Sequence, residues 1–195
     1  MSKKTLYGQT HSRVVTSRSG TVRVNKRLLS TKQTKVLTRL RDMSEIELID
    51  EVARAVEHHW LLKDSKYPKV RLAVAKTSDT FHDKLVNDEY WGTRLAVARA
   101  STTYHAQLVN DEHWWVRLVV AETSTTYHDQ LVNDENWSIR ATIANASDKY
   151  HDQLVTDPHW AVRLTVARFS TRYHHILKDD TEAEVREAVE NYTEE

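Results

Sequence analysis

The stretch TYHDQLVNDENWSIRATIANAS, residues 126–147, decides the fold. It brings a histidine, several carboxylates, a tryptophan and an arginine into 22 residues, a combination that active sites use. The same residue types, however, return along the chain every 23 residues. An internal period of 20–50 residues is typical of stacked repeat architectures, so the repeat has to be interpreted before any chemistry.

Five ladders of identical residues share this period. Arginine recurs at Arg71, Arg94, Arg117, Arg140, Arg163 and Arg186, and histidine at His59, His82, His105, His128, His151 and His174. Leucine recurs at Leu62, Leu85, Leu108, Leu131, Leu154 and Leu177. Tryptophan recurs at Trp91, Trp114, Trp137 and Trp160, and serine at Ser78, Ser101, Ser124, Ser147 and Ser170. Five ladders in one register indicate a repeated structural unit.

Each unit is predicted to form two short helices. In residues 125–134, Thr126 and Asp129 have the spacing of a carboxylate variant of the capping box, which predicts a helix of about two turns. In residues 134–147, the side chains of Ile139, Ile143 and Ala144 fall on one face of an amphipathic helix. Because neither helix buries its apolar face alone, the units must stack. The sequence therefore predicts an all-α fold, a right-handed α-solenoid of about six 23-residue two-helix repeats.

The chain divides into three predicted segments: a basic N-terminal arm over 1–41, a helical cap over 42–69 and HEAT-like repeats over 70–195. The cap is expected to be one helix from Ser44 to about His58. Its expected apolar stripe consists of Ile46, Ile49, Val52, Ala53 and Val56. The last unit replaces tryptophan by alanine and apolar residues by Glu187 and Glu190, as a polar terminal repeat requires.

The arm carries a charge asymmetry that the net charge of zero conceals. Residues 1–41 hold eleven Lys and Arg and no acidic residue, which leaves 17 basic and 28 acidic residues in 42–195. The arm is therefore +11 and the body −11, and such asymmetry is a clue to partners. Within the arm, RVVTSRSGTVRV (13–24) predicts a β-hairpin with Gly20 in its turn. Residues 25–40 predict a basic helix.

Composition excludes several classes of site. The absence of cysteine excludes disulfides, thiolate metal sites and cysteine nucleophiles. No apolar run approaches the ~20 residues of a membrane helix. The start, MSKKTLYGQT, has no apolar run after its lysines, so no secretory signal is expected. We expect a cytoplasmic protein with no membrane contact.

The ladders of charged residues and histidines are interpreted as structural. An active site needs one constellation, whereas a stack needs one per unit. Each ladder aspartate is expected to cap a helix and to pair with an arginine of its own or of a neighbouring unit. The residues are Asp88, Arg94, Asp111, Arg117, Asp134, Arg140, Asp157 and Arg163. The histidines are expected to hydrogen-bond within the stack, since zinc wants three or four ligands and no second ligand recurs beside every histidine. No metal, cofactor or catalytic residue is predicted.

The tryptophans are the candidates for a binding surface. The ladder tryptophans are expected mainly to staple successive units, with an exposed aromatic row for partner binding or base stacking as the alternative. Trp115 lies off the ladder among small residues and is predicted to be an exposed contact, with His113 and Tyr90 near it. In the arm, the candidate contacts are Arg13, Arg18, Arg23, Lys26 and Arg27.

The pattern VNDEHWWVRLVVAETSTTYHDQL, residues 109–131, resembles the units of leucine-rich-repeat-variant proteins and, more broadly, of HEAT-like α-solenoids. Their D-x-x-x-x-V-R-x-x-V-A core is matched by Asp111, Val116, Arg117, Val120 and Ala121. The period is 23 rather than 24, and tryptophan and Tyr-His replace prolines. That family's iron–sulfur segment needs cysteines, so no cluster is implied. The resemblance implies a binding scaffold, because a fold by itself carries no activity.

Three functions follow as hypotheses. The first is a non-enzymatic scaffold, an adaptor or inhibitor, that binds a protein partner through a repeat surface and the arm. The second is a nucleic-acid-binding protein of HEAT-like type that grips phosphates with the arm. The third is an enzyme similar to the HEAT-like alkylpurine DNA glycosylases, whose basic DNA cradle contrasts with the −11 body here. The sequence leaves the partner and the oligomeric state open.

Overall fold

The computed structural model describes residues 15–16, 22–23 and 30–192. The chain forms two compact units, Met1–Leu85 and Val86–Glu195, each of which is described by itself. No helix in the described residues is long and apolar enough to cross a membrane.

The first unit contains a two-stranded antiparallel pair and five α-helices among its described residues. The elements are β1 (Val15–Thr16), β2 (Val22–Arg23), α1 (Thr31–Arg41), α2 (Glu45–Arg54), the 3₁₀ helix η2 (Val56–His58), α3 (His59–Leu62), α4 (Pro68–Thr77), the 3₁₀ helix η3 (Asp79–Phe81) and α5 (His82–Leu85). Val15 pairs with Arg23 and Thr16 with Val22, as a hairpin over residues 13–24 requires. Its predicted turn residue, Gly20, lies outside the described residues.

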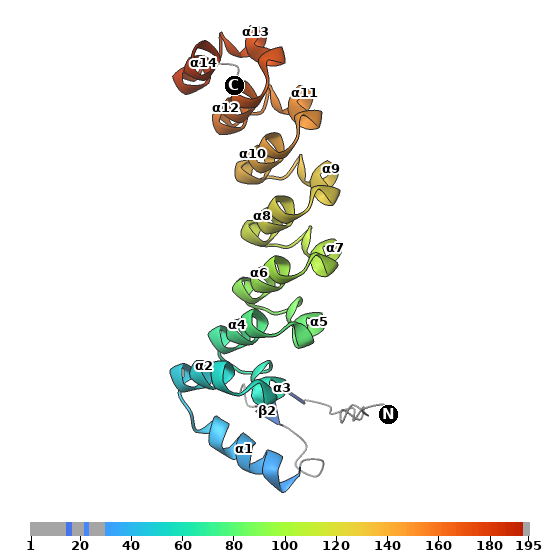
Figure 1. Cartoon of the computed structure of the whole chain (residues 1–195), viewed down its shortest axis with the longest axis vertical. Coiled ribbons are helices and arrows are strands. Elements are labelled where there is room, and N and C mark those ends of the chain that lie inside the picture. The colour runs from blue at the N-terminus through green and yellow to red at the C-terminus, as the bar shows by residue number, and fades with distance from the viewer. Residues whose placement is uncertain (1–14, 17–21, 24–29, 193–195) are drawn as a thin grey trace, which may run out of the picture. The chain divides into compact units, whose positions relative to one another are not determined.

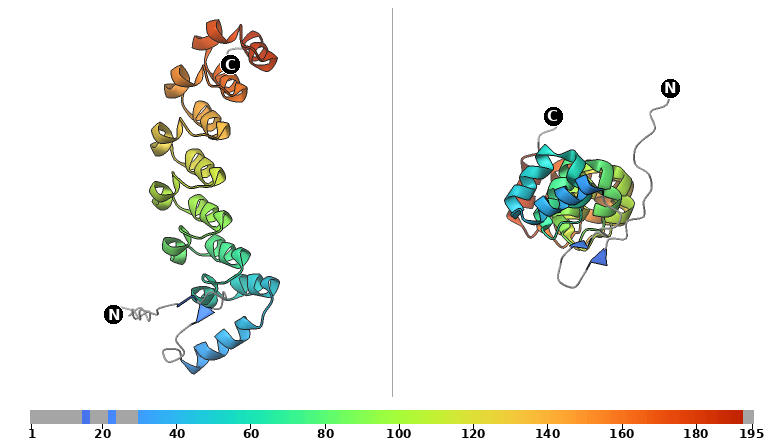
Figure 2. Two further views of the ribbon diagram at one scale, coloured as in Figure 1. Left: turned by 180° about the vertical axis from the view of Figure 1, so that it is seen from behind. Right: turned by 90° about the horizontal axis from the view of Figure 1, so that it is seen from below.

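The second unit repeats one pattern, a ten-residue helix, a 3₁₀ turn and a four-residue helix. The elements are α6 (Trp91–Ala100), η4 (Thr102–Tyr104), α7 (His105–Leu108), α8 (Trp114–Thr123), η5 (Thr125–Tyr127), α9 (His128–Leu131), α10 (Trp137–Ala146), η6 (Asp148–Tyr150), α11 (His151–Leu154), α12 (Trp160–Phe169), η7 (Thr171–Tyr173), α13 (His174–Leu177) and α14 (Ala183–Glu190). The long helices form one layer and the short helices the other (Figures 1 and 2). The predicted all-α solenoid of stacked helix pairs is confirmed.

The core of the second unit is continuous because every unit supplies the same apolar positions. On the long helices, Val116, Ile139, Val162 and Val185 are completely buried, and so are Val97, Val120, Ile143 and Val166 one turn later. The short helices add Leu108, Leu131, Leu154 and Leu177. Successive long helices pack on one another in sequence order. No helix of the pair has a complete core without its neighbours, as stacked repeats require.

One serine per unit both ends the long helix and starts the 3₁₀ turn. Ser124 has an extended backbone, and its N–H donates to the Val120 carbonyl while its hydroxyl accepts from Thr126 N. The predicted capping box of Thr126 and Asp129 is therefore wrong. The cap lies two residues earlier, and the short segment is a 3₁₀ turn followed by α9 (His128–Leu131) rather than one two-turn helix.

The predicted single helix from Ser44 to His58 is also wrong. Ala55 takes a non-helical conformation (φ −136°, ψ 80°), so α2 ends at Arg54 and a 3₁₀ turn and α3 follow. Residues 45–62 are thus a further unit of the same kind, in which Ala55 occupies the position of the serine. Ser44 starts the helix with a capping box to Glu47.

The predicted apolar stripe of this helix is wrong as well. Ile46 and Val56 are exposed, whereas Leu48, Val52 and Ala55 are buried. The stripe failed because the chain leaves the helix at Ala55, so Val56 no longer shares a face with Val52. The basic helix expected over 25–40 is formed by α1, which begins with a capping box between Ser30 and Gln33.

Candidate binding surface

The arginine and aspartate ladders connect neighbouring units. Arg140 donates from Nε and Nη2 to the two carboxylate oxygens of Asp157, at 2.6 and 2.8 Å, seventeen residues further along the chain. Its third nitrogen, Nη1, donates to the main-chain carbonyl of Asp134 in its own unit at 2.6 Å. The same bidentate geometry recurs for Arg94 with Asp111, Arg117 with Asp134 and Arg163 with Asp180. The hydrogen bonds from aspartate raise the pKa of all four guanidinium groups.

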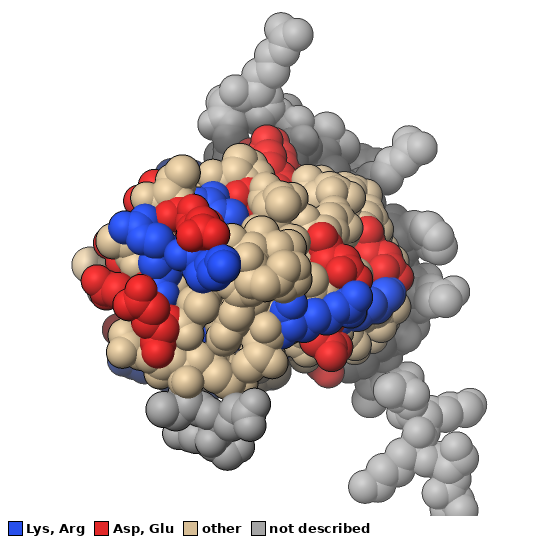
Figure 3. Space-filling view, turned by 90° about the horizontal axis from the view of Figure 1, so that it is seen from above, with Lys and Arg blue, Asp and Glu red and all other residues tan. Residues whose placement is uncertain are grey.

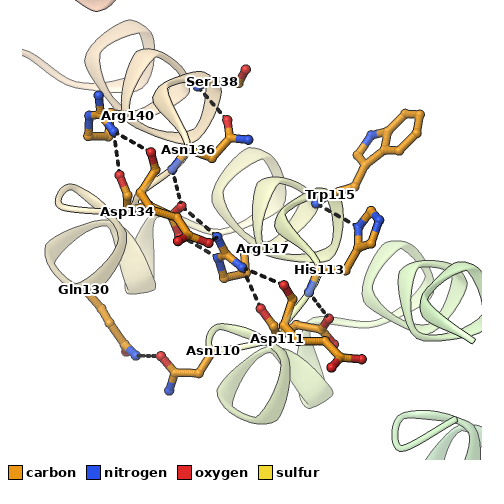
Figure 4. Close-up of polar contacts among 12 residues, drawn as sticks. Asn110, Asp111, His113, Trp115, Arg117, Gln130, Asp134, Asn136, Ser138 and Arg140 are labelled. Carbon is orange, nitrogen blue, oxygen red and sulfur yellow. Dashed lines mark hydrogen bonds and ion pairs between the residues drawn. The ribbon is translucent and has the colours of Figure 1, made fainter. Parts of the chain in front are cut away.

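Each ladder aspartate also positions the residue that precedes the long helix of its unit. One oxygen of Asp111 accepts the backbone N–H of His113 at 2.9 Å, and one of Asp157 accepts that of His159 at 2.8 Å. Asp134 holds Asn136 in the same way at 2.8 Å (Figure 4). These N-terminal residues are the N-caps of α8, α12 and α10. The arginine of one unit thereby fixes the helix entry of the next.

The histidine ladder terminates the long helices. The Nε2 atom of His128 lies 2.9 Å from the carbonyl of Ala121, which is near the end of α8, where the helix offers no N–H donor of its own. His59, His82, His105, His151 and His174 make the corresponding contact at 2.7–2.9 Å. Because a carbonyl only accepts, Nε2 carries the proton. Among the described residues, no group of three or more His, Asp or Glu side chains is arranged to hold a metal.

Ladder tryptophans and N-cap histidines form stacks that run from unit to unit. The His113 ring lies on Trp91 with centroids 4.2 Å apart and planes 7° apart, and it is followed by Trp114 at 6.3 Å and 15°. His159 lies on Trp137 at 4.3 Å and 2°, and it is followed by Trp160 at 6.0 Å and 22°. We call these residues, with Trp115, the aromatic row.

The tryptophans of the row are both stapled and exposed. Trp114, Trp137 and Trp160 keep 38%, 42% and 39% of their surface in solvent. The expected stapling and the alternative of an exposed aromatic row thus describe different parts of the same rings: one face contacts the next unit, and the rest of the ring meets solvent. No hydrogen bond to an indole N–H of the row is found among the described residues.

Trp115 is 42% exposed and lies 5.6 Å from both Trp91 and Trp114, nearly parallel to each. It projects away from the Arg117 and Asp134 side chains (Figure 4). Tyr90 lies beside Trp91, with centroids 5.7 Å apart, and its ring covers Gly92, where a Cβ atom would come within 2.6 Å of it. The structure therefore gathers Trp115, His113 and Tyr90 around Trp91; their role in partner binding stays a prediction.

Acidic side chains lie next to the row. Glu112 and Glu135, which immediately precede His113 and Asn136, are 82% and 84% exposed while they contact Arg94 and Arg117. Between these units lies an open depression of about 410 Å³ lined in part by Asp111, Arg117 and Asp134. These polar groups are already paired with each other. On the face of the molecule in Figure 3, Lys and Arg side chains lie beside Asp and Glu, so neither sign forms a continuous patch there.

The arm is described only in part. The candidate residues Arg13, Arg18, Lys26 and Arg27 lie outside the described residues, and Arg23 lies in β2, where only the backbone is described. On α1, Lys32 and Lys35 are exposed, while Arg39 contacts Glu51 and Arg41 contacts Asp42.

Comparison with solved structures finds a chain described as a leucine-rich repeat variant with a novel repetitive protein structural motif. The TM-score is 0.72 and the identity 22%, over 85% of this chain and 72% of that one. The fold is that of a leucine-rich repeat variant. The resemblance carried by Asp111, Val116 and Arg117 is confirmed at the level of the fold, and at this identity the likeness extends no further. The sequence matches no protein-family model and no curated protein. A leucine-rich-repeat-variant solenoid of this kind is a scaffold suited to binding interactions.

Proposed function

We propose that this chain is a non-enzymatic scaffold, an adaptor or inhibitor, that binds a protein partner on the aromatic row. The observation that carries the proposal is the exposure of Trp114, Trp115, Trp137 and Trp160 on one frame. Tryptophan is among the residues enriched at interface hot spots, where its large apolar area becomes desolvated. The N-terminal arm serves as the second contact element.

The frame holds the row in place before a partner arrives. Arg140 binds Asp157, Asp157 holds His159, and the ring of His159 lies flat on Trp137. A surface whose side chains are already ordered loses less conformational entropy on binding. This pre-organisation favours recognition of a partner by shape.

A protein partner fits the row better than a nucleic acid. Base stacking requires a free ring face, and the His113 and His159 rings already occupy one face of Trp91 and of Trp137. Exposed Glu112 and Glu135 beside the row repel phosphates.

The test is affinity isolation from native lysate with two variants of the full chain. Trp115→Ala/Trp137→Ala removes two exposed rings of the row, and Phe169→Ala/Ile176→Ala removes two exposed apolar side chains outside it. We expect a specific protein to be retained by the wild type and the control and lost by the row variant. Equal retention by both variants would refute the proposal.

A nucleic-acid partner is the second candidate, because eleven basic residues in 1–41 occur without one acidic residue. It predicts that the full chain binds generic duplex DNA or RNA at low salt. With five to seven phosphates neutralised, affinity should fall by about 10³-fold or more between 50 and 200 mM salt. Replacing Arg13, Arg18, Arg23, Lys26 and Arg27 by Gln should abolish that binding in a mobility-shift titration. We expect weak binding that these substitutions leave unchanged, because a −11 body accompanies the arm.

A further inference from the structure

The aromatic row has a measurable period. The two ring separations through His113, 4.2 and 6.3 Å, add up to an upper limit of about 10.5 Å between the Trp91 and Trp114 centroids. The separations through His159, 4.3 and 6.0 Å, limit Trp137 and Trp160 to about 10.3 Å. Packed helices lie ~8–10 Å apart, so one tryptophan ridge per unit recurs at about this spacing.

Few extended conformations of a peptide repeat at this distance. A polyproline II helix rises ~3.1 Å per residue with three residues per turn, which gives ~9.3 Å per turn. A β-strand presents side chains on one face every ~6.6 Å, and an α-helix repeats every ~5.4 Å. Only the polyproline turn matches one step of the row, so its residues i, i+3, i+6 and i+9 would face Trp91, Trp114, Trp137 and Trp160.

We infer that the aromatic row binds a proline-rich segment of a partner protein in polyproline II conformation, with three residues per repeat. This inference rests on the proposed function and specifies the partner. Proline-rich segments dock into aromatic-lined grooves, and the nearly parallel rings of the row form such ridges.

The hydrogen-bonding chemistry of the row complements such a segment. A polyproline II helix makes no internal hydrogen bonds, so its carbonyl oxygens remain free to accept. The indole nitrogen of tryptophan only donates. No hydrogen bond to an indole N–H of the row occurs among the described residues, so these groups are available to the carbonyls.

Charge specifies the flanks of the segment. Glu112 and Glu135 lie beside the row and are more than four-fifths exposed, which favours Lys or Arg in the bound segment. The arm supplies basic residues but no proline. The two prolines of this chain, Pro68 and Pro158, lie at the start of α4 and just before α12. The occupant is therefore a segment of another protein rather than the arm.

The test uses synthetic peptides and the full chain, with binding followed by calorimetry and tryptophan emission. The probe has proline at every third position and two lysines at one end, and the control peptide carries alanine in place of proline. We expect the probe to bind and the control peptide to bind at least about tenfold more weakly. We also expect affinity to rise when the probe grows by three residues but not by one. Equal binding of both peptides, or gains in steps of two residues, would overturn the inference.

Two variants locate the binding on the row. Trp137→Ala should weaken the probe about tenfold or more, as loss of a hot-spot ring does. Ile176→Ala removes an apolar side chain of α13 that is also exposed, and it should leave the affinity unchanged. An unaltered affinity in Trp137→Ala would contradict the assignment. Oligo(dT) competing with the probe through the same tryptophans would also contradict it.

The outcome separates this inference from the proposed function. If the lysate experiment retains a partner through the row while no proline-rich probe binds, the polyproline inference is wrong and the scaffold function stands. If neither the partner nor the probe depends on the row, both are wrong.

Discussion

Replacing Arg140 by alanine should destabilise the fold by leaving a carboxylate unpaired. The side chains of Arg140 and Asp157 are only 12% and 4% exposed, and the pair is bidentate at 2.6 and 2.8 Å. Removing one partner of a buried pair costs ~3–5 kcal/mol. Asp157 keeps one donor, the N–H of His159, so the lower end of that range, about 3 kcal/mol, applies.

Urea denaturation measures this loss. With a slope of about 2 kcal/mol per molar urea, 3 kcal/mol corresponds to a midpoint lowered by about 1.5 M. The matched control is Asp157→Asn, which removes the charge but retains an oxygen for His159 N. Because the double variant carries no orphan charge, it should be more stable than Arg140→Ala alone, with a coupling of about 1–3 kcal/mol. An unchanged midpoint in Arg140→Ala, or additivity within about 0.5 kcal/mol, would refute the reasoning.

Three further predictions concern stability. His128→Leu orphans the Ala121 carbonyl and should cost about 1–3 kcal/mol, seen as a lower urea midpoint; an unchanged midpoint would argue against the helix-terminating role. Ser124→Ala removes a cap and should cost about 1 kcal/mol, whereas Ser124→Asn should recover most of it in the same assay. The hydrogen bond from Arg163 lowers the pKa of Asp180 below its ordinary 3.8, so its charge stabilises the fold at neutral pH and this contribution disappears as pH falls below about 4. Asp180→Asn should therefore lose less stability than the wild type between pH 5 and pH 3, and equal losses would contradict the assignment.

The period and the helix pairs followed from the sequence because apolar spacing and repetition are local signals. Ile139, Ile143 and Ala144 share the buried face that their spacing predicted. Helix ends were less predictable. Thr126 has the residue type and spacing of a cap, but Ser124 provides it because the chain turns there through an extended residue. Ala55, which lacks a capping side chain, gave no sign that α2 would end beside it.

The candidate surface was less predictable than the fold because it depends on contacts between units. The register aligned Arg140 with both Asp134 and Asp157 but did not decide which carboxylate it binds. The geometry assigns the side-chain pair to Asp157 and the main-chain carbonyl to Asp134. The stacking of His159 on Trp137 had a detectable signal, since histidine precedes tryptophan in two units, yet the 22-residue separation hides the contact.

These contacts make the stability of the stack and the order of the surface parts of one arrangement. Arg140 orders Asp157, Asp157 orders His159, and His159 covers one face of Trp137. A substitution at Arg140 should therefore weaken binding at the row even though the guanidinium lies away from it, because the free rings would then sample more rotamers. At Arg117 the same sequence of contacts ends in Asn136, which has no ring. If pre-organisation by stacking matters for binding, Arg140→Ala should reduce affinity more than Arg117→Ala, although both remove a bidentate pair.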